Sequence, residues 1–151
     1  MDTQKSIDLL NSLIEINNDR VEGYETAANE TDAADLKSLF AELKNTSVQN
    51  LGALRSAVTE LGGTPEEGTR VTGKFFRAWM DVKAALTGNN RHQILSSCEF
   101  GEDKALEVYE DILVNSPTAL SGEQLSMIRS QQAALRDDHD KVKMLRDAVN
   151  A

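Results

Sequence analysis

The sequence is poor in residues that crosslink or interrupt a chain. Its single cysteine, Cys98, cannot form an internal disulfide, so a reducing cytoplasm is the expected setting. Two prolines and nine glycines among 151 residues leave room for long uninterrupted helices. No stretch approaches the roughly 20 apolar residues of a membrane-spanning helix. The first residues also lack the basic and apolar segments of a signal peptide, so we expect a cytoplasmic protein without a membrane partner.

Basic residues are also scarce relative to acidic ones. Sixteen Lys and Arg residues face 25 Asp and Glu residues, which gives a formal net charge of -9. A surface of this sign repels phosphate groups, so we expect no nucleic-acid partner. The length is that of one domain, and it is sufficient to bury a core without disulfides or structural metal.

Apolar residues recur at intervals of three and four in four long segments, which is typical of amphipathic helices. In the first segment, the expected core-facing stripe consists of Ile7, Leu10, Ile14, Asn17, Val21, Tyr24 and Ala28. The predicted helices span residues 3–29, 32–61, 90–114 and 121–149. Residues that favour helix ends support these limits. They are Asp32 as an N-cap, Gly62 and Gly63 as a stop, and capping pairs at Asn90 with Gln93 and at Ser121 with Gln124.

The segment 64–89 joins the second and third long helices. Thr64-Pro65-Glu66-Glu67 is a typical helix start, and an amphipathic stretch with Phe75, Phe76 and Trp79 follows it. We therefore predict a crossover with a short extra helix, whose aromatic residues are candidates for an interaction surface. Short links make each helix pair antiparallel, whereas the crossover lets the second and third long helices run parallel. The predicted fold is an all-α, ferritin-like four-helix bundle with one long crossover.

Each long helix carries polar residues in the middle of its apolar stripe. We predict that they form a buried polar belt, consisting of Asn17, Tyr24, Ser47, Asn50, Glu102, Tyr109 and Asp138. An internal repeat supports their register, because Asn17 precedes Tyr24 by seven residues and Glu102 precedes Tyr109 by seven. In carboxylate di-metal bundles, one helix of each pair supplies a Glu and its partner supplies Glu-x-x-His. The belt lies where such a site would be.

Two interpretations of the polar belt remain open. The preferred one is a hydrogen-bonded network that fixes helix register, because Glu102 and Asp138 are the only carboxylates in the belt and it has no imidazole. If these two carboxyl groups meet without a cation, one of them should be protonated. The competing hypothesis is a metal-binding or redox protein, with iron or manganese held by Glu102 and Asp138 together with His139 or Glu99.

The chain resembles the ferritin-like superfamily, and more closely a family of small bacterial ferritin-like four-helix-bundle proteins of unknown function. The resemblance is carried by Ile16-Asn17-Asn18-Asp19, Gly23-Tyr24-Glu25, Gly62-Gly63-Thr64-Pro65, Gly73, Arg77-Ala78-Trp79, Cys98-Glu99-x-Gly101-Glu102, His139-Asp140 and Leu145-Arg146-Asp147. It implies a degenerate di-metal site, because Asn17, Ser47, Asn50 and Leu135 stand where metal-binding members have Glu and Glu-x-x-His. We predict a non-enzymatic bundle without metal or cofactor. It would act through self-association, with a dimer favoured, or through a protein partner, in a bacterial stress response.

Overall fold

The computed structural model describes residues 2–68 and 90–149, and all structural statements concern these residues. Its elements are α1 (Thr3–Glu30), α2 (Ala34–Glu60), α4 (Arg91–Asn115), the short 3-10 helix η1 (Pro117–Ala119) and α5 (Gly122–Val149). The described residues contain no strand, which confirms the predicted all-α class with four long helices. Each helix boundary lies within two residues of its predicted position.

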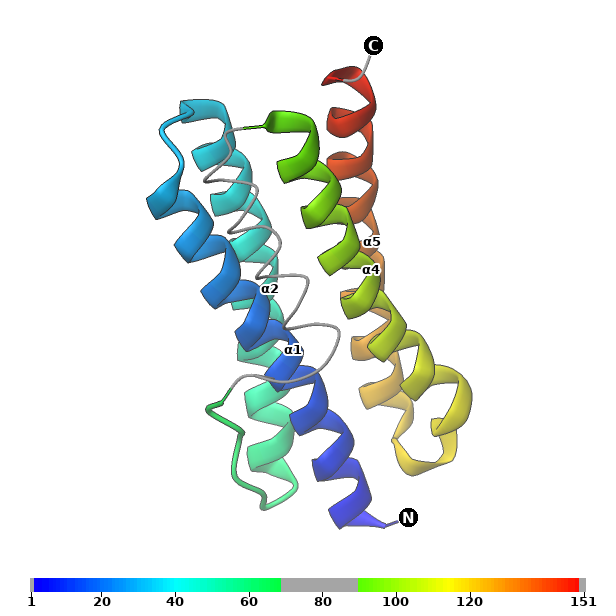
Figure 1. Ribbon diagram of the computed structural model, residues 1–151. Helices are drawn as coiled ribbons and strands as arrows, with labels where there is room; N and C mark the ends of the chain where they lie inside the picture. Colours follow the sequence, from blue (N-terminus) through cyan, green and yellow to red (C-terminus); the bar gives the residue numbers. More distant parts are fainter. Residues whose placement is uncertain (1, 69–89, 150–151) are drawn as a thin grey trace.

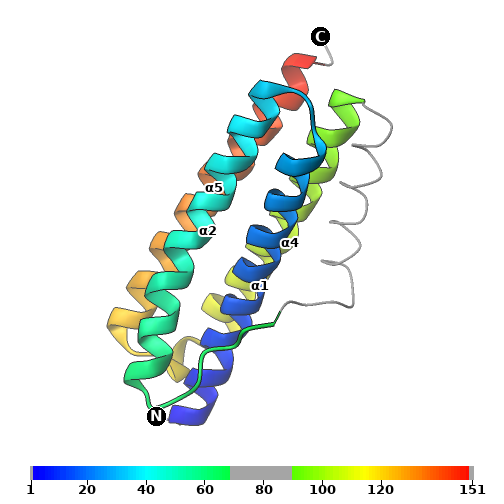
Figure 2. The same ribbon diagram turned by 90° about the vertical axis from the view of Figure 1, so that its left-hand side faces the viewer.

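The four long helices form two packed pairs. α1 packs against α2 and α4 packs against α5, while α1 also contacts α4 and α2 contacts α5. In Figure 1, α2 and α4 both begin at the upper end of the bundle, and α1 and α5 both begin at the lower end. The members of each pair are therefore antiparallel, and α2 runs parallel to α4, as the turned view in Figure 2 also shows. The predicted extra helix with Phe75, Phe76 and Trp79 lies outside the described residues.

Three helix ends have the predicted local chemistry. The Asn90 side chain accepts a hydrogen bond from the backbone N–H of Gln93 at 3.0 Å and caps α4. Before α5, the Ser121 hydroxyl accepts from the N–H of Gln124 at 3.1 Å, and the Gln124 side chain accepts from the N–H of Ser121 at 2.9 Å. After α2, Gly62 has a φ of 84°, a conformation that favours glycine. These ends depend on neighbours in sequence, which explains why they were predictable.

Two predicted helix starts are wrong. Ala33 is the N-cap residue of α2 in place of Asp32, and the Thr31 hydroxyl accepts a 3.3 Å hydrogen bond from the Ala33 N–H. The residues 63–68 are not helical, although Thr64 and Pro65 favour a helix start. Instead, the Asn11 side chain on α1 bonds to the carbonyl of Thr64 at 3.1 Å and to the N–H of Glu66 at 2.8 Å. The Gly68 N–H, which would donate to the Thr64 carbonyl in a helix, donates to the Glu66 side chain at 3.0 Å.

Two apolar clusters fill the bundle on either side of the polar belt. One contains Leu10, Leu13, Ile14, Leu54, Ile112 and Ile128, and the other contains Tyr24, Phe40, Leu43, Ile94, Cys98 and Val142. Along α1, α2 and α4, the buried side chains of Asn17, Arg20, Ser47, Asn50 and Glu102 fall between these sets, so the belt crosses the middle of the core. Within the described residues, no helix has the length and apolar character needed to span a bilayer.

Candidate functional site

A fully buried arginine occupies the centre of the polar belt. The Arg20 Nη2 atom donates to both carboxylate oxygens of Glu102, at 2.8 and 3.0 Å, and to Asp138 Oδ2 at 3.1 Å. Its Nη1 atom donates to the Ser47 hydroxyl at 2.5 Å. Because Arg20 lies on α1 and these partners lie on α2, α4 and α5, one guanidinium joins all four long helices.

The charges around Arg20 keep its guanidinium ionised. Burial by itself lowers the pKa of Arg20, but the negative charges of Glu102 and Asp138 raise that pKa above its ordinary value. The guanidinium carbon also lies 5.4 Å from the centroid of the Tyr24 ring, within the range of a cation–π contact. Burial raises the pKa of Asp138, and the Arg20 charge partly opposes that rise. Glu102 and Asp138 therefore meet around a cation. The prediction that one of these carboxyl groups is protonated applied only if no cation lay between them, so it does not apply here.

The tyrosine in each half of the internal repeat forms a hydrogen bond with the polar residue of the other half. Asn17 of the first half donates to the Tyr109 hydroxyl at 2.8 Å, and the Tyr24 hydroxyl donates to Glu102 of the second half. This reciprocal pairing fits two antiparallel helices, α1 and α4, that meet at equivalent positions. Burial raises the pKa of both tyrosines, and the Glu102 charge adds to the rise for Tyr24. Both hydroxyls therefore remain protonated and can donate at neutral pH.

Asn17 connects the remaining belt residues to the arginine. Its side-chain oxygen accepts from the Ser47 hydroxyl at 2.8 Å and from Asn50 at 3.2 Å. The Tyr109 hydroxyl donates to Gln131 at 2.7 Å, and Gln131 in turn donates to the Asn50 carbonyl at 3.4 Å. Since Ser47 also accepts from Arg20, the structure brings all seven predicted belt residues into one continuous network.

Sequence reasoning missed Arg20 and left Gln131 out of the belt. The expected stripe of α1 passed through Val21, which is half-buried, whereas Arg20 is fully buried. A positional signal was available, because Arg20 lies three residues after Asn17 and four before Tyr24 and therefore shares their face. The internal repeat gave no such signal. It relates Asn17 and Tyr24 to Glu102 and Tyr109, 85 positions later, and the residue at the same offset from Arg20 is Ala105.

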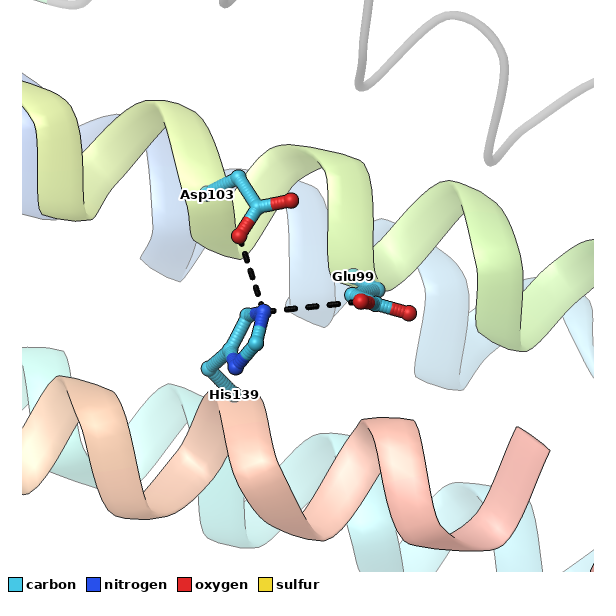
Figure 3. A group of neighbouring side chains, drawn as sticks. All are labelled: Glu99, Asp103 and His139. Carbon is cyan, nitrogen blue, oxygen red and sulfur yellow. Dashed lines mark ion pairs between the residues drawn. The ribbon is translucent and has the colours of Figure 1, made fainter. Parts of the chain in front are cut away.

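A second cluster of ionisable side chains joins α4 to α5 outside the belt (Figure 3). His139 Nε2 lies 2.8 Å from Asp103 Oδ1 and 3.5 Å from Glu99 Oε1. One ligand atom from each of these residues lies within 4.8 Å of the other two, so the group could hold a metal ion. The four residues of the competing metal hypothesis are therefore divided between two places. Glu102 and Asp138 bind Arg20 in the belt, while Glu99 and His139 meet outside it with Asp103, which was not predicted.

The fold and the belt define the class of protein as an all-α four-helix bundle with a buried, charged hydrogen-bond network. The chain belongs to the family described as "Domain of unknown function (DUF2383)", whose model matches residues 5–115. The match runs from α1 to the end of α4 and includes Arg20 and Glu102, whereas Asp138 and His139 lie beyond it. A comparison with curated proteins found no match.

Proposed function

We propose that this protein is a ferritin-like bundle with a degenerate di-metal site, and that it acts through association rather than catalysis. The observation that carries the proposal is the Arg20 guanidinium between Glu102 and Asp138. Arg20 supplies a fixed positive charge at the level of the bundle where carboxylate di-metal proteins bind their ions. The parallel direction of α2 and α4 is compatible with ferritin-like topology.

The belt residues do not fit a metal ion. Apart from Glu102 and Asp138, the predicted belt offers neutral amides and hydroxyls, and both carboxylates already bind Arg20. A divalent ion placed roughly 4 Å from the guanidinium would be repelled by about 8 kcal/mol at an effective dielectric constant of 20. Arg20 would have to leave the core for such an ion to bind. This argues against the competing proposal of an iron or manganese redox centre at Glu102 and Asp138.

Metal analysis distinguishes the two proposals for the belt. We expect that Glu102→Gln does not change the iron or manganese content of protein purified without chelator, since the belt holds neither ion. Near-stoichiometric iron or manganese that is lost in Glu102→Gln would contradict the degenerate-site proposal. The melting temperature with and without each ion provides a second readout, because an ion that binds the folded state raises it.

Exposed apolar side chains at the end of α5 support association with a second copy. Met144, Leu145 and Val149 are 66%, 36% and 42% exposed. Leu145 and Val149 also border a surface groove that reaches Leu36 and Leu95 on neighbouring helices. We propose that a dimer covers this surface, since burial of apolar area is the main driving force for association. A role in a bacterial stress response belongs to the same proposal and rests on the family resemblance alone.

Sedimentation velocity over a range of concentrations tests the association. We expect a dimer for the wild type and a shift toward monomer for the double variant Leu145→Asp/Val149→Asp. Val48→Asp, at a similarly exposed apolar position on α2, is the matched control and should remain dimeric. The variant Trp79→Ala tests the surface predicted from the crossover in the same assay. A wild type that is monomeric at all concentrations would rule out self-association and leave only a different protein partner.

A further inference from the structure

We propose that Glu99, Asp103 and His139 form a binding site for a divalent transition-metal ion, with zinc as its representative. The site lies on the α4–α5 pair and not in the belt, so the inference goes beyond the proposed function and does not rest on it. It depends on the position of one imidazole ring among carboxylates (Figure 3).

Both ring nitrogens of His139 face carboxylate oxygens. Nδ1 lies 3.1 Å from Asp140 Oδ1, while Nε2 lies 2.8 Å from Asp103 Oδ1 and 3.5 Å from Glu99 Oε1. A neutral imidazole carries only one N–H, so it can donate to one of these sides only. When Nδ1–H donates to Asp140, the lone pair of Nε2 points at two negative groups. A positive centre on that side, either a proton or a metal ion, removes this repulsion.

The surroundings of the three residues also position them for a metal ion. Glu99 and Asp103 are four residues apart on α4 and therefore lie on the same face of the helix. Arg146 Nη1 holds the Oε2 atom of Glu99, which leaves Oε1 directed at the imidazole. The contact of Asp140 with Nδ1 is the carboxylate–histidine arrangement that orients metal-binding imidazoles. Glu99 and His139 are thus each oriented by a contact to the polar atom that does not face the proposed ion.

The type and spacing of the ligands indicate which ions fit. Tetrahedral zinc, with bonds of about 2.0–2.2 Å to nitrogen and oxygen, separates its ligand atoms by roughly 3.3 Å. The two distances from Nε2, 2.8 and 3.5 Å, lie on either side of that value. Asp103 is half-exposed, so water can reach the fourth coordination position. Magnesium and calcium prefer sets of oxygen ligands, so the imidazole selects against them.

An ion at this site would link the two helices of the second pair. Glu99 and Asp103 come from α4 and His139 comes from α5, so bound zinc would act as a crosslink between them. Because the unfolded chain does not hold the three ligands together, binding stabilises the folded state. At a free zinc concentration 100-fold above the dissociation constant, linkage predicts a rise in melting temperature of roughly 5–10 °C.

Isothermal titration calorimetry with zinc chloride on the chelator-treated full chain tests the proposal. We expect one zinc ion per chain, at least tenfold weaker binding in both Asp103→Asn and His139→Gln, and no binding of magnesium. Asp137→Asn, on the exposed face of α5, and His92→Gln, in the first turn of α4, are matched controls and should bind like the wild type. Because Asp103 is half-exposed, Asp103→Asn should fold normally, which circular dichroism verifies.

Two outcomes would overturn the site. Either the wild type does not bind zinc, or both Asp103→Asn and His139→Gln bind it as well as the wild type does. Glu102→Gln separates this proposal from the belt, because it should retain zinc binding if the outer cluster is the site. Loss of zinc in Glu102→Gln with retention in Asp103→Asn would place the ion in the belt instead.

Discussion

Replacing Arg20 with methionine removes the cation from the centre of the belt while keeping a long apolar side chain. The Glu102 carboxylate is fully buried and would then lack its charged partner. Leaving one member of a buried ion pair unpaired costs about 3–5 kcal/mol. For a chain of this size, each kcal/mol lowers the melting temperature by about 2–4 °C, so Arg20→Met should melt roughly 6–20 °C below the wild type.

The double variant Arg20→Met/Glu102→Met distinguishes the net contribution of the ion pair to stability from the cost of leaving one buried charge unpaired. Replacing both members of a buried ion pair with apolar residues is often neutral, because the desolvation penalty disappears with the attraction. The Arg20 Nε atom is buried without a hydrogen-bond partner among the described residues, which adds to that penalty in the wild type. The Tyr24 hydroxyl loses its acceptor in the double variant, so recovery should be incomplete. We expect a coupling energy of at least about 2 kcal/mol in the mutant cycle.

Urea unfolding followed by circular dichroism gives the required free energies, provided that the slope of the transition is unchanged. Arg136→Met is the matched control, because Arg136 is exposed on α5, and it should change stability by less than about 0.5 kcal/mol. If Arg20→Met costs no more than Arg136→Met, Arg20 does not neutralise the buried carboxylates. The single variant Glu102→Met completes the cycle. If the stability lost in the double variant equals the sum of the losses in Arg20→Met and Glu102→Met, the two residues do not interact.

Three further predictions concern other parts of the bundle. Burial raises the pKa of Asp138 above its ordinary value of 3.8, so the folded state binds a proton more tightly than the unfolded chain does. This group therefore lowers the stability of the wild type as the pH rises from 3.8 through the pKa of Asp138 in the folded state. The urea midpoint of Asp138→Asn relative to the wild type should therefore increase with pH across that range, whereas the exposed Asp137→Asn should show no such trend. Tyr109→Phe removes the hydroxyl that accepts from Asn17 and donates to Gln131, so one buried N–H and one buried oxygen each lose a hydrogen bond. The change should cost about 1–3 kcal/mol in the same assay, and a loss below about 0.5 kcal/mol would show that the network does not depend on this hydroxyl. Gly62→Ala should cost about 1–2 kcal/mol because of the positive φ of Gly62. Gly52→Ala should stabilise the helix by about 0.5–1 kcal/mol, since an added Cβ meets no atom within 4 Å. Stability changes of the same sign in both variants would refute this interpretation.

Local interactions explain why much of the fold was predictable. Helix periodicity depends on residues three and four apart, and capping pairs such as Ser121 with Gln124 depend on residues three apart. Thr64 and Pro65 show the limit of such reasoning. Their local preference for a helix start is not realised, and the segment bonds instead to Asn11, which lies more than 50 positions earlier on α1.

Two positions on the core-facing side of α1 could not be read from heptad spacing alone. An α-helix has 3.6 residues per turn, so a strict repeat of 3.5 drifts across its surface. The buried line of α1 passes through Arg20 and Ala27, whereas the expected stripe passed through Val21 and Ala28. A shift of one position turns a side chain by about 100° around the helix, and here it exchanges a half-buried valine for a buried charge.

The sequence by itself determined the four amphipathic helices, the ends formed by local capping, and the polar residues on the apolar stripes. The tertiary structure alone decided that the belt contains a cation. A buried arginine is tolerated only where its charge is paired, and the partners of Arg20 lie 27, 82 and 118 positions away on three other helices. The outer cluster also exists only in three dimensions, because α4 and α5 must pack before His139 meets Glu99 and Asp103. Residue spacing records which side chains share a helix face, but the packing of helices determines which charges meet.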